Sequence, residues 1–206
     1  MIIYKNKYLR IIFQNNKYFF EINDDKDNKI LINTFLNIPE DGYNKKIIIL
    51  AEDINTLEHF LKKKISIKMC KLIFLFLIKQ LKHLEDNNLT ILNYSIKDII
   101  YFKINGEYSF YFLNNKAIFS FDKNKKILIN KLFIKNDFLS PEIHNIKEIP
   151  NNSILITASY WSLAKIMEYC LKTVNKDLED IKYTKLYWAL HRCLKVNPKH
   201  RYLLFI

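Results

Sequence analysis

Cysteine and histidine are the residue types in this chain that most often act as nucleophiles or metal ligands. Its three cysteines, Cys70, Cys170 and Cys193, lie far apart in helical apolar patterns, and none belongs to a C-x-x-C motif. Cys193 comes two positions after His191, but residues two apart on a helix point to different sides. The sequence therefore predicts buried free thiols and argues against a Cys/His nucleophile or a zinc site.

The histidines also lack the repeated spacing of a metal-binding motif. They are His59, His83, His144, His191 and His200. Histidines scattered in this way are expected to lie at the surface or to pack against helices. We expect neither a bound metal nor a cofactor.

Composition and charge limit the remaining classes of function. Apolar residues make up 50% of the 206 residues, which is enough to bury the core of a globular protein. The net charge of +12 suggests nucleic-acid binding, because Lys and Arg attract phosphate backbones. The lysines, however, are spread along the whole chain beside abundant Asn and Ile, without an aromatic-basic repeat. A coding bias towards Lys, Asn and Ile, which would suit an AT-rich viral or parasite genome, explains the charge better.

The chain shows no targeting or membrane signal. The start from Met1 to Lys7 lacks the continuous apolar stretch of a secretory signal, and the longest apolar run, Leu72–Ile78, is too short to span a bilayer. We therefore expect an intracellular, cytoplasmic protein, in the host cytoplasm if the source is a virus, with no membrane partner.

Short apolar and aromatic runs predict strands at the start of the chain and a hairpin near its middle. The expected strands cover residues 8–13, 17–22, 29–36 and 46–50. Two further runs, 101–104 and 108–112, flank Asn105-Gly106, a dipeptide that takes the positive φ angles of a tight hairpin turn at little cost.

Helical spacing of apolar residues predicts the other elements. One helix begins within residues 56–61, and a long helix with one apolar stripe runs from Ile67 to about residue 86. Ser159 is expected to cap a later helix, and another helix lies around residues 186–193. Asn197 and Pro198 are expected to restart a helix over the last residues.

Three motifs occur in an order that is typical of one family. Leu139-Ser140-Pro141-Glu142 resembles the A-P-E element that closes a kinase activation segment. Tyr160-Trp161-Ser162-Leu163-Ala164 resembles the D-x-W-S-L-G start of the central helix of the large lobe. The run from Cys193 to Arg201 matches the pattern C-L-x-x-D-P-x-x-R, with Asn197 in place of Asp. With the order of the predicted elements, these motifs make the chain resemble the eukaryotic protein kinase fold.

The resemblance implies an α+β, protein kinase-like fold with two lobes. A remnant small β lobe would span residues 1–50, and a mainly helical large lobe would span residues 51–206, with residues 49–53 resembling the hinge between them. In the family, the Glu of the A-P-E element pairs with the Arg of the last motif. The resemblance therefore implies a structural ion pair between Glu142 and Arg201.

The positions that should carry kinase catalysis are degenerate. When the family's H-R-D-L-x-x-x-N motif is aligned on the hairpin, Ser95 falls at the catalytic base and Ile100 at a magnesium-binding Asn. Asn114 stands near the expected D-F-G Asp, and Lys97 matches a Lys that helps the transferred phosphate. Ser95 is uncharged near neutral pH, and Ile100 has no oxygen to offer magnesium. Catalysis is therefore expected to be lost.

The nucleotide-binding parts are also missing from the pattern. The two glycines, Gly42 and Gly106, lie outside the first hairpin, so a Gly-rich loop is excluded. Asn33, on the expected third strand, stands about where the phosphate-binding Lys should be, and residues 34–45 are too short and turn-rich for the helix that carries its Glu partner. Asp98 is an alternative catalytic base, but a shift of three residues would turn it away from the substrate, so a solvated turn residue is favoured.

The sequence thus favours a pseudokinase that regulates or inhibits a kinase or signalling partner by binding it. Truncated kinase-like proteins of this architecture occur in viruses that blunt host stress kinases, so the expected partner is a protein such as a host kinase or its substrate. Two alternatives stay open, namely a divergent active serine/threonine kinase and a basic nucleic-acid-binding domain. Phosphate binding weakens steeply as salt rises, so a salt series separates the second alternative.

Overall fold

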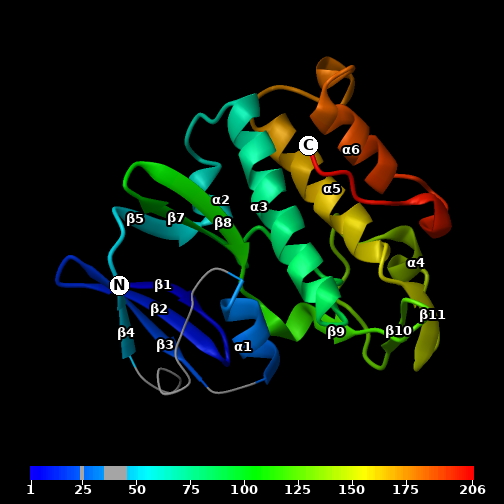
Figure 1. The fold of residues 1–206 in the computed structure, drawn as a ribbon, viewed down its shortest axis with the longest axis horizontal. Helices are drawn as coiled ribbons and strands as arrows, with labels where there is room; N and C mark the ends of the chain where they lie inside the picture. Colours follow the sequence, from blue (N-terminus) through cyan, green and yellow to red (C-terminus); the bar gives the residue numbers. More distant parts are fainter. Residues whose placement is uncertain (24–25, 35–45) are drawn as a thin grey trace. The chain divides into compact units, whose positions relative to one another are not determined.

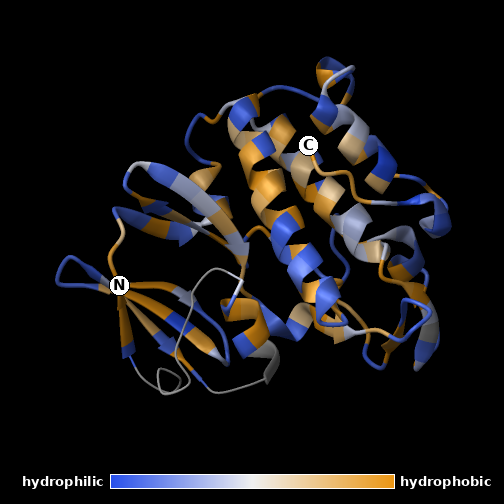
Figure 2. Ribbon diagram, viewed as in Figure 1, coloured by the Kyte–Doolittle hydropathy of each residue, from blue (hydrophilic) through white to orange (hydrophobic). Residues whose placement is uncertain are grey.

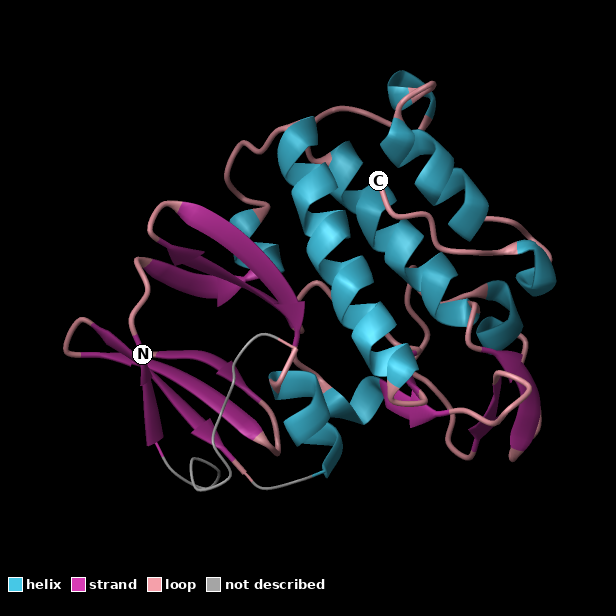
Figure 3. Ribbon diagram, viewed as in Figure 1, coloured by secondary structure: helices cyan, strands magenta, loops and turns pink. Residues whose placement is uncertain are grey.

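A computed structural model describes residues 1–23, 26–34 and 46–206 of the chain (Figure 1). Helices occur together with several antiparallel sheets, which confirms the predicted α+β class (Figure 3). Among the described residues, no helix is both long and apolar enough to cross a membrane.

The chain separates into two compact units. The first unit comprises residues 1–63 and 96–116, and the second unit comprises residues 64–95 and 117–206. This division differs from the predicted boundary between residues 50 and 51. The reason is strand pairing, because a strand at residues 53–56 pairs with the hairpin at residues 99–112 and both therefore belong to the first unit.

The first unit opens with a four-stranded antiparallel sheet. Its order is β1-β2-β3-β4, with β1 at Ile2–Lys5, β2 at Leu9–Gln14, β3 at Lys17–Ile22 and β4 at Lys46–Ile49. Asn15 and Asn16 connect β2 to β3 with φ angles of 52° and 57°. Asn tolerates these left-handed angles, which suit a two-residue hairpin turn. The strands predicted at residues 8–13, 17–22 and 46–50 are confirmed.

The strand predicted at residues 29–36 is wrong where the structure describes it. Helix α1 covers Lys26–Ile32 instead, and residues 35 and 36 lie outside the described residues. Leu31 and Ile32 are completely buried. A continuous apolar run of this length fits a strand and a short buried helix equally well, so periodicity alone could not decide.

The rest of the first unit is a three-stranded sheet with a short helix. β5 (Asp53–Thr56), β7 (Ile99–Ile104) and β8 (Glu107–Phe112) pair in the order β5-β7-β8. Asn105 and Gly106 form the turn of the β7–β8 hairpin with positive φ, as predicted. Thr56 caps α2 (Leu57–Phe60) by accepting a hydrogen bond from the backbone N–H of His59 at 3.2 Å.

Three helices dominate the second unit. They are α3 (Ile67–Asp86), α5 (Ala158–Lys172) and α6 (Lys185–Cys193), and α5 packs against both α3 and α6. Ser66 caps α3 by accepting a hydrogen bond from the N–H of Met69 at 3.2 Å. Each helix is amphipathic, and Figure 2 shows hydrophobic and hydrophilic positions along the same ribbon of α3. The helices predicted from residue 67 and around residues 186–193 are confirmed.

Two predicted features of these helices differ in the structure. Ser159 lies inside α5 and is buried, where its hydroxyl donates to the carbonyl of Ile156 at 2.6 Å, so Ser159 is not the N-cap. Asn197 does cap the next turn, but Pro198–His200 is a single 3₁₀ turn and the residues after it are not helical. Arg201 follows the turn with extended backbone angles, φ −87° and ψ 137°, so the helix does not continue.

The second unit is completed by short elements. Its remaining strands and α-helix are β6 (Leu89–Ile91), β9 (Ile118–Ser120), β10 (Lys126–Ile129), α4 (Pro141–His144) and β11 (Asn151–Leu155). Strands β6 and β9 pair with each other, as do β10 and β11. Short 3₁₀ turns occur at Asn115–Ala117, where the chain passes from the first unit to the second, and at Glu179–Ile181, before α6.

Candidate functional site

The segment that aligns with a kinase catalytic loop connects β6 to β7. Within it, Tyr94 is completely buried and Ser95 is partly exposed, and both belong to the second unit. Lys97, in the first unit, is exposed, and its Nζ lies 3.7 Å from Oε1 of Glu58. Both partners of that ion pair face solvent, so the pair holds Lys97 only weakly.

Ile100, the position aligned with a magnesium-binding Asn, is part of the core of the first unit. It lies in β7, opposite Thr56 of β5 and Tyr111 of β8, and it is completely buried among apolar side chains. Its sec-butyl side chain contributes packing there and offers no oxygen to a cation. At this position the structure uses an apolar residue to stabilise the unit.

Asp98 lies at the centre of a small polar cluster in the first unit. Its Oδ1 accepts a hydrogen bond from the hydroxyl of Tyr4 at 3.2 Å, and its Oδ2 accepts one from Nδ2 of Asn114 at 2.9 Å. Asn6 extends the cluster, because its Nδ2 donates to the Tyr4 hydroxyl at 3.2 Å and to the Leu113 carbonyl at 3.0 Å. The interpretation of Asp98 as a solvated turn residue is therefore wrong.

Burial, and not a neighbouring cation, shifts the pKa values of the groups in this cluster. Burial raises the pKa of Asp98, and the hydrogen bonds from Asn114 and Tyr4 only partly offset this effect. Burial also raises the pKa of Tyr4, and the negative charge of Asp98 adds to the rise. A half-buried carboxyl with a raised pKa can exchange a proton, but the cluster contains one carboxylate and so gives magnesium a single anionic ligand.

Asn33 does not lie on a strand. It follows the last turn of α1, where its backbone N–H donates to the carbonyl of Lys29 at 2.9 Å. The comparison of Asn33 with a phosphate-binding Lys on a third strand therefore fails. The stretch from Thr34 to Lys45 was expected to be too short for the helix that carries the Glu partner. Most of it lies outside the described residues.

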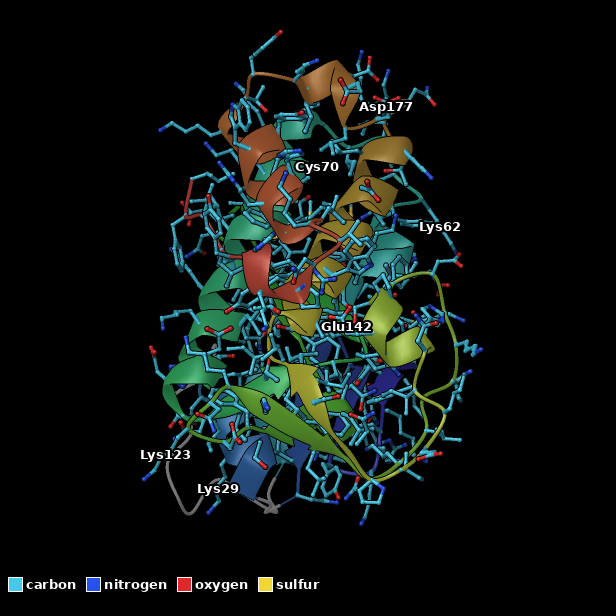
Figure 4. The ribbon with its side chains drawn as sticks, turned by 90° about the vertical axis from the view of Figure 1, so that its right-hand side faces the viewer. Lys29, Lys62, Cys70, Lys123, Glu142 and Asp177 are labelled. Atoms are coloured by element: carbon cyan, nitrogen blue, oxygen red, sulfur yellow. The ribbon has the colours of Figure 1, made fainter. Side chains whose placement is uncertain are left out.

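In the second unit, Glu142 and Arg201 form a two-pronged ion pair. Nη1 of Arg201 lies 2.5 Å from Oε1 of Glu142, and Nη2 lies 3.0 Å from Oε2. The Arg201 side chain is completely buried, and that of Glu142, labelled in Figure 4, is 17% exposed. Two parallel charge-assisted bonds match the planar fork of a guanidinium to a carboxylate.

Further partners fix the guanidinium of Arg201. Its Nε donates to the carbonyl of Lys195 at 2.6 Å, and its Nη2 donates to the carbonyl of Val196 at 3.0 Å. The guanidinium carbon also lies 4.9 Å from the centre of the Trp161 ring. Arg201 thereby joins the three segments that contain the kinase-like motifs, since Glu142, Trp161 and Lys195 belong to one motif each.

Other candidate ligands are not gathered into a site. Among the described residues, no group of three or more His, Cys, Asp and Glu side chains could hold a metal ion. All three cysteines are buried, and burial raises the pKa of Cys70 to about 11 and that of Cys193 to about 12. Thiols with such pKa values are protonated near neutral pH and are poor nucleophiles.

The residues that resemble a hinge line a hollow in the first unit. Its volume is about 290 Å³, and its walls include Ile49 to Glu52 together with Lys17 and Asn105. Glu52 is already engaged, because its carboxylate lies 2.6 Å from the Lys103 Nζ and accepts a hydrogen bond from the Gly106 N–H. Lys17 is the one cation in this wall among the described residues, so the hollow offers little to a triphosphate.

The sequence could not have indicated part of this arrangement. Tyr4 and Asn6 are 94 and 107 residues from the groups that they bind, and no motif marks either of them. Of the predicted site residues, the structure brings together Glu142 and Arg201. Lys97 is exposed whereas Ile100 is buried, so these two do not face one site, and Asn114 binds the carboxylate of Asp98.

No protein-family model matches the chain, and no curated protein matches it in sequence. The kinase resemblance therefore depends on the motifs and the geometry of this chain alone.

Proposed function

We propose that the chain is a catalytically inactive, protein kinase-like protein that regulates or inhibits a kinase or another signalling partner by binding to it. The observation that carries the proposal is the ion pair between Glu142 and Arg201. It supports a kinase-like large lobe because it joins the A-P-E-like segment to the last motif, as the resemblance implies, at a separation of 59 residues.

The side chains at the aligned positions support the absence of catalysis in this proposal. Ile100 packs in an apolar core, and Ser95 has no negative charge with which to orient a substrate hydroxyl. Nδ2 of Asn114 donates a hydrogen bond to Asp98, and its Oδ1 accepts one from the backbone N–H of Lys116 at 3.1 Å. Magnesium needs several oxygen ligands, at least one or two of them carboxylates, and these positions do not supply them.

A scaffold without chemistry can still act by binding. A ligand or partner shifts an equilibrium only by as much as it prefers one state over the other, so a kinase-like protein can hold its partner in one conformation through differential contacts. The partner expected on this basis is a protein kinase or a kinase substrate, which are the molecules that recognise a kinase surface.

A melting experiment with ATP and magnesium tests the proposal. A ligand that binds only the native state stabilises it by RT ln(1 + [L]/Kd), so millimolar ATP on a micromolar site would add on the order of 4 kcal/mol. We expect no magnesium-dependent shift and no phosphate release. A shift that disappears in Lys97→Ala but persists in Lys62→Ala, a matched exposed lysine of the same unit, would contradict the proposal.

One observation favours a second candidate, a divergent active kinase. Asp98 is a half-buried carboxyl whose pKa is raised by burial, and a catalytic base near the end of this loop would have such properties. Slow phosphate release by the parent protein that is lost in Asp98→Asn, with melting unchanged, would establish this candidate. We expect no release from either protein.

A further inference from the structure

The outward face of α6 has a composition that its role in the fold does not explain. Leu186, Leu190 and Cys193 bury the inner face of the helix. The outer face carries Lys185, Trp188 and Arg192, which are spaced three or four residues apart and so form one stripe, and Lys195 follows the end of the helix. Ordinary solvent-facing helices mix both signs of charge and rarely expose a tryptophan.

Trp188 is exposed but held in place. The residue is 45% exposed, and its ring meets the rings of Tyr187 and His191 edge to face at centroid distances of 5.1 and 6.0 Å. These contacts restrict the indole before any partner arrives. An exposed and pre-ordered tryptophan is the type of residue that most often dominates the energy of a protein interface.

The chain end continues this surface beside α6. The guanidinium of Arg192 lies 5.2 Å from the ring centre of Tyr202, which is 42% exposed. Val196 and Phe205 are also exposed, by 81% and 58%. We call Lys185, Trp188, Arg192, Lys195, Val196 and Tyr202 the α6 surface.

The charged side chains of α6 and of the residues after it are basic, although Glu179 and Asp180 lie in the 3₁₀ turn that packs against the helix. From Ile181 to Ile206 the sequence contains no Asp or Glu, whereas it contains the basic residues Lys182, Lys185, Arg192, Lys195, Lys199 and Arg201. Arg201 is neutralised by Glu142, and Lys182 lies 3.4 Å from Glu179. Among the residues that the structure describes, no carboxylate pairs with Lys185, Arg192 or Lys195.

The pKa of His191 responds to the neighbouring positive charges. Its pKa is lowered first by partial burial and then by the charges of Lys195 and Arg192, against which Glu179 acts in the opposite direction. Nε2 of His191 lies 3.4 Å from the Lys195 Nζ, so the neutral imidazole accepts a hydrogen bond from the ammonium group. The α6 surface is therefore positive near neutral pH without help from His191.

We propose that the α6 surface binds an acidic polypeptide segment of a partner protein, with Asp or Glu side chains on Lys185, Arg192 and Lys195 and an apolar side chain on Trp188. Complementary charge selects the partner, and the indole supplies apolar contact area. This inference names the chemistry of a partner and so rests on the proposed function, a protein that acts by binding.

The geometry favours a peptide over a nucleic acid. Single-stranded nucleic acids bind in positive grooves with several aromatic platforms for successive bases. Here Lys185 and Arg192 project from the convex outer face of a helix. Trp188 is the exposed aromatic side chain on that face, the ring of Tyr202 already contacts the guanidinium of Arg192, and the neighbouring Val196 is aliphatic. An aliphatic side chain has no π-face on which a base can stack.

Fluorescence anisotropy of the full chain with a short labelled peptide of Asp and Glu with central leucines tests the inference. The triple variant Lys185→Glu, Arg192→Glu, Lys195→Glu should weaken binding by more than about tenfold, and Trp188→Ala by about tenfold. The matched control reverses Lys123, Lys126 and Lys147, three exposed lysines of the second unit. Asp177 lies in the loop before α6. In Figure 4 it appears at the opposite end of the view from the control position Lys123.

The outcomes separate this inference from the function proposed above. Failure of the peptide to bind, or equal weakening by the control triple, would overturn the α6 surface, and so would single-stranded RNA that binds more tightly than the peptide. None of these results bears on the test with ATP and magnesium. A magnesium-dependent melting shift would overturn the pseudokinase while leaving the peptide result as it is.

Discussion

Two carboxylates, one in each unit, show how different partners change the role of the same chemical group. In the first unit, Asp98 accepts hydrogen bonds from the neutral groups of Tyr4 and Asn114, and burial raises its pKa. In the second unit, Glu142 faces a guanidinium that is completely buried and binds it through both oxygens. Neutral donors leave part of the desolvation of a carboxylate uncompensated, whereas a cationic fork offsets much more of it.

Removal of Asp98 should lower the free energy of unfolding only modestly. Removal of Glu142 leaves the buried charge of Arg201 without its partner. Asp98 ties strand β1 to the end of the β7–β8 hairpin within the first unit. Glu142 holds an Arg that also binds the backbone of two other segments. Mutations at the two places should therefore differ in the size of their effect on the free energy of unfolding.

The largest effect is expected from Arg201→Ala or Glu142→Ala. Each variant leaves the other charge buried without its partner, and such losses cost about 3 to 5 kcal/mol. Chemical denaturation of each variant measures this cost. Lys182→Ala, which breaks the exposed pair of Lys182 with Glu179, is the control and should cost less than about 0.5 kcal/mol. Equal midpoints for Arg201→Ala and the parent protein would show that the ion pair does not stabilise the second unit.

A smaller effect is expected from Tyr4→Phe. The variant removes a hydroxyl that donates to Asp98 and accepts from Asn6, and the loss of such a hydrogen bond costs about 1 kcal/mol. The pKa of Asp98, measured by NMR, should also rise further, because one bond to its charged form is gone. Tyr183→Phe changes the same group at an 81% exposed position and should leave stability unchanged. A fall in the pKa of Asp98 in Tyr4→Phe would mean that the hydroxyl does not stabilise the carboxylate.

Partly buried carboxyls whose pKa is raised make the stability of the protein depend on pH. Burial raises the pKa of Glu85 in the second unit, as it does that of Asp98, and a hydrogen bond from Tyr160 offsets only part of the rise. The folded state then holds more protons than the unfolded state above pH 4.5, the ordinary value for Glu. The contribution of Glu85 to stability is therefore fully present below that pH and is lost as pH rises through the raised pKa.

Glu85→Gln tests this origin of the pH dependence. The variant cannot ionise at this position, so the decline in the urea midpoint above pH 4.5 should become shallower. Glu107→Gln, at an exposed position on β8, is the matched control and should keep the slope of the parent protein. A slope that is the same in Glu85→Gln and the parent would assign the pH dependence to other groups.

The smallest effect is expected from Asp86→Ala. Asp86 lies 2.9 Å from the Nζ of Lys82 on the surface of α3, and both side chains are at least half exposed. Exposed pairs four residues apart on a helix contribute about 0.3 to 0.5 kcal/mol, and salt screens them. The difference in the free energy of unfolding between Asp86→Ala and the parent protein should vanish at high salt. The corresponding difference for Arg201→Ala should persist. A loss of stability in Asp86→Ala that does not change with salt would show that this pair is shielded from solvent like the Glu142–Arg201 pair.

The ion pair of the second unit and the Asp98 cluster of the first unit were not equally predictable. Glu142 and Arg201 lie in motifs whose order and spacing are visible in the chain, so the resemblance alone implies their pairing. The cluster around Asp98 could not be predicted, because Tyr4 and Asn6 carry no local pattern and reach their partners only after the strands have paired. The basic residues of the outer face of α6 are visible in the sequence, but the exposure of Trp188 depends on which side of the helix packs against α5.

Local patterns in the sequence were enough to specify several elements. Alternation of apolar residues specified β2 and β3, Asn105-Gly106 specified the hairpin turn, and one long apolar stripe specified α3, since each depends on residues a few positions apart. The tertiary structure alone decided that Leu31 and Ile32 lie on a helix, that Ser159 is buried inside α5, and that residues 53–56 join the hairpin in one unit. Those outcomes depend on which distant surfaces bury one another, and burial of a short apolar segment can outweigh its local preference because the hydrophobic gain exceeds the small differences in propensity.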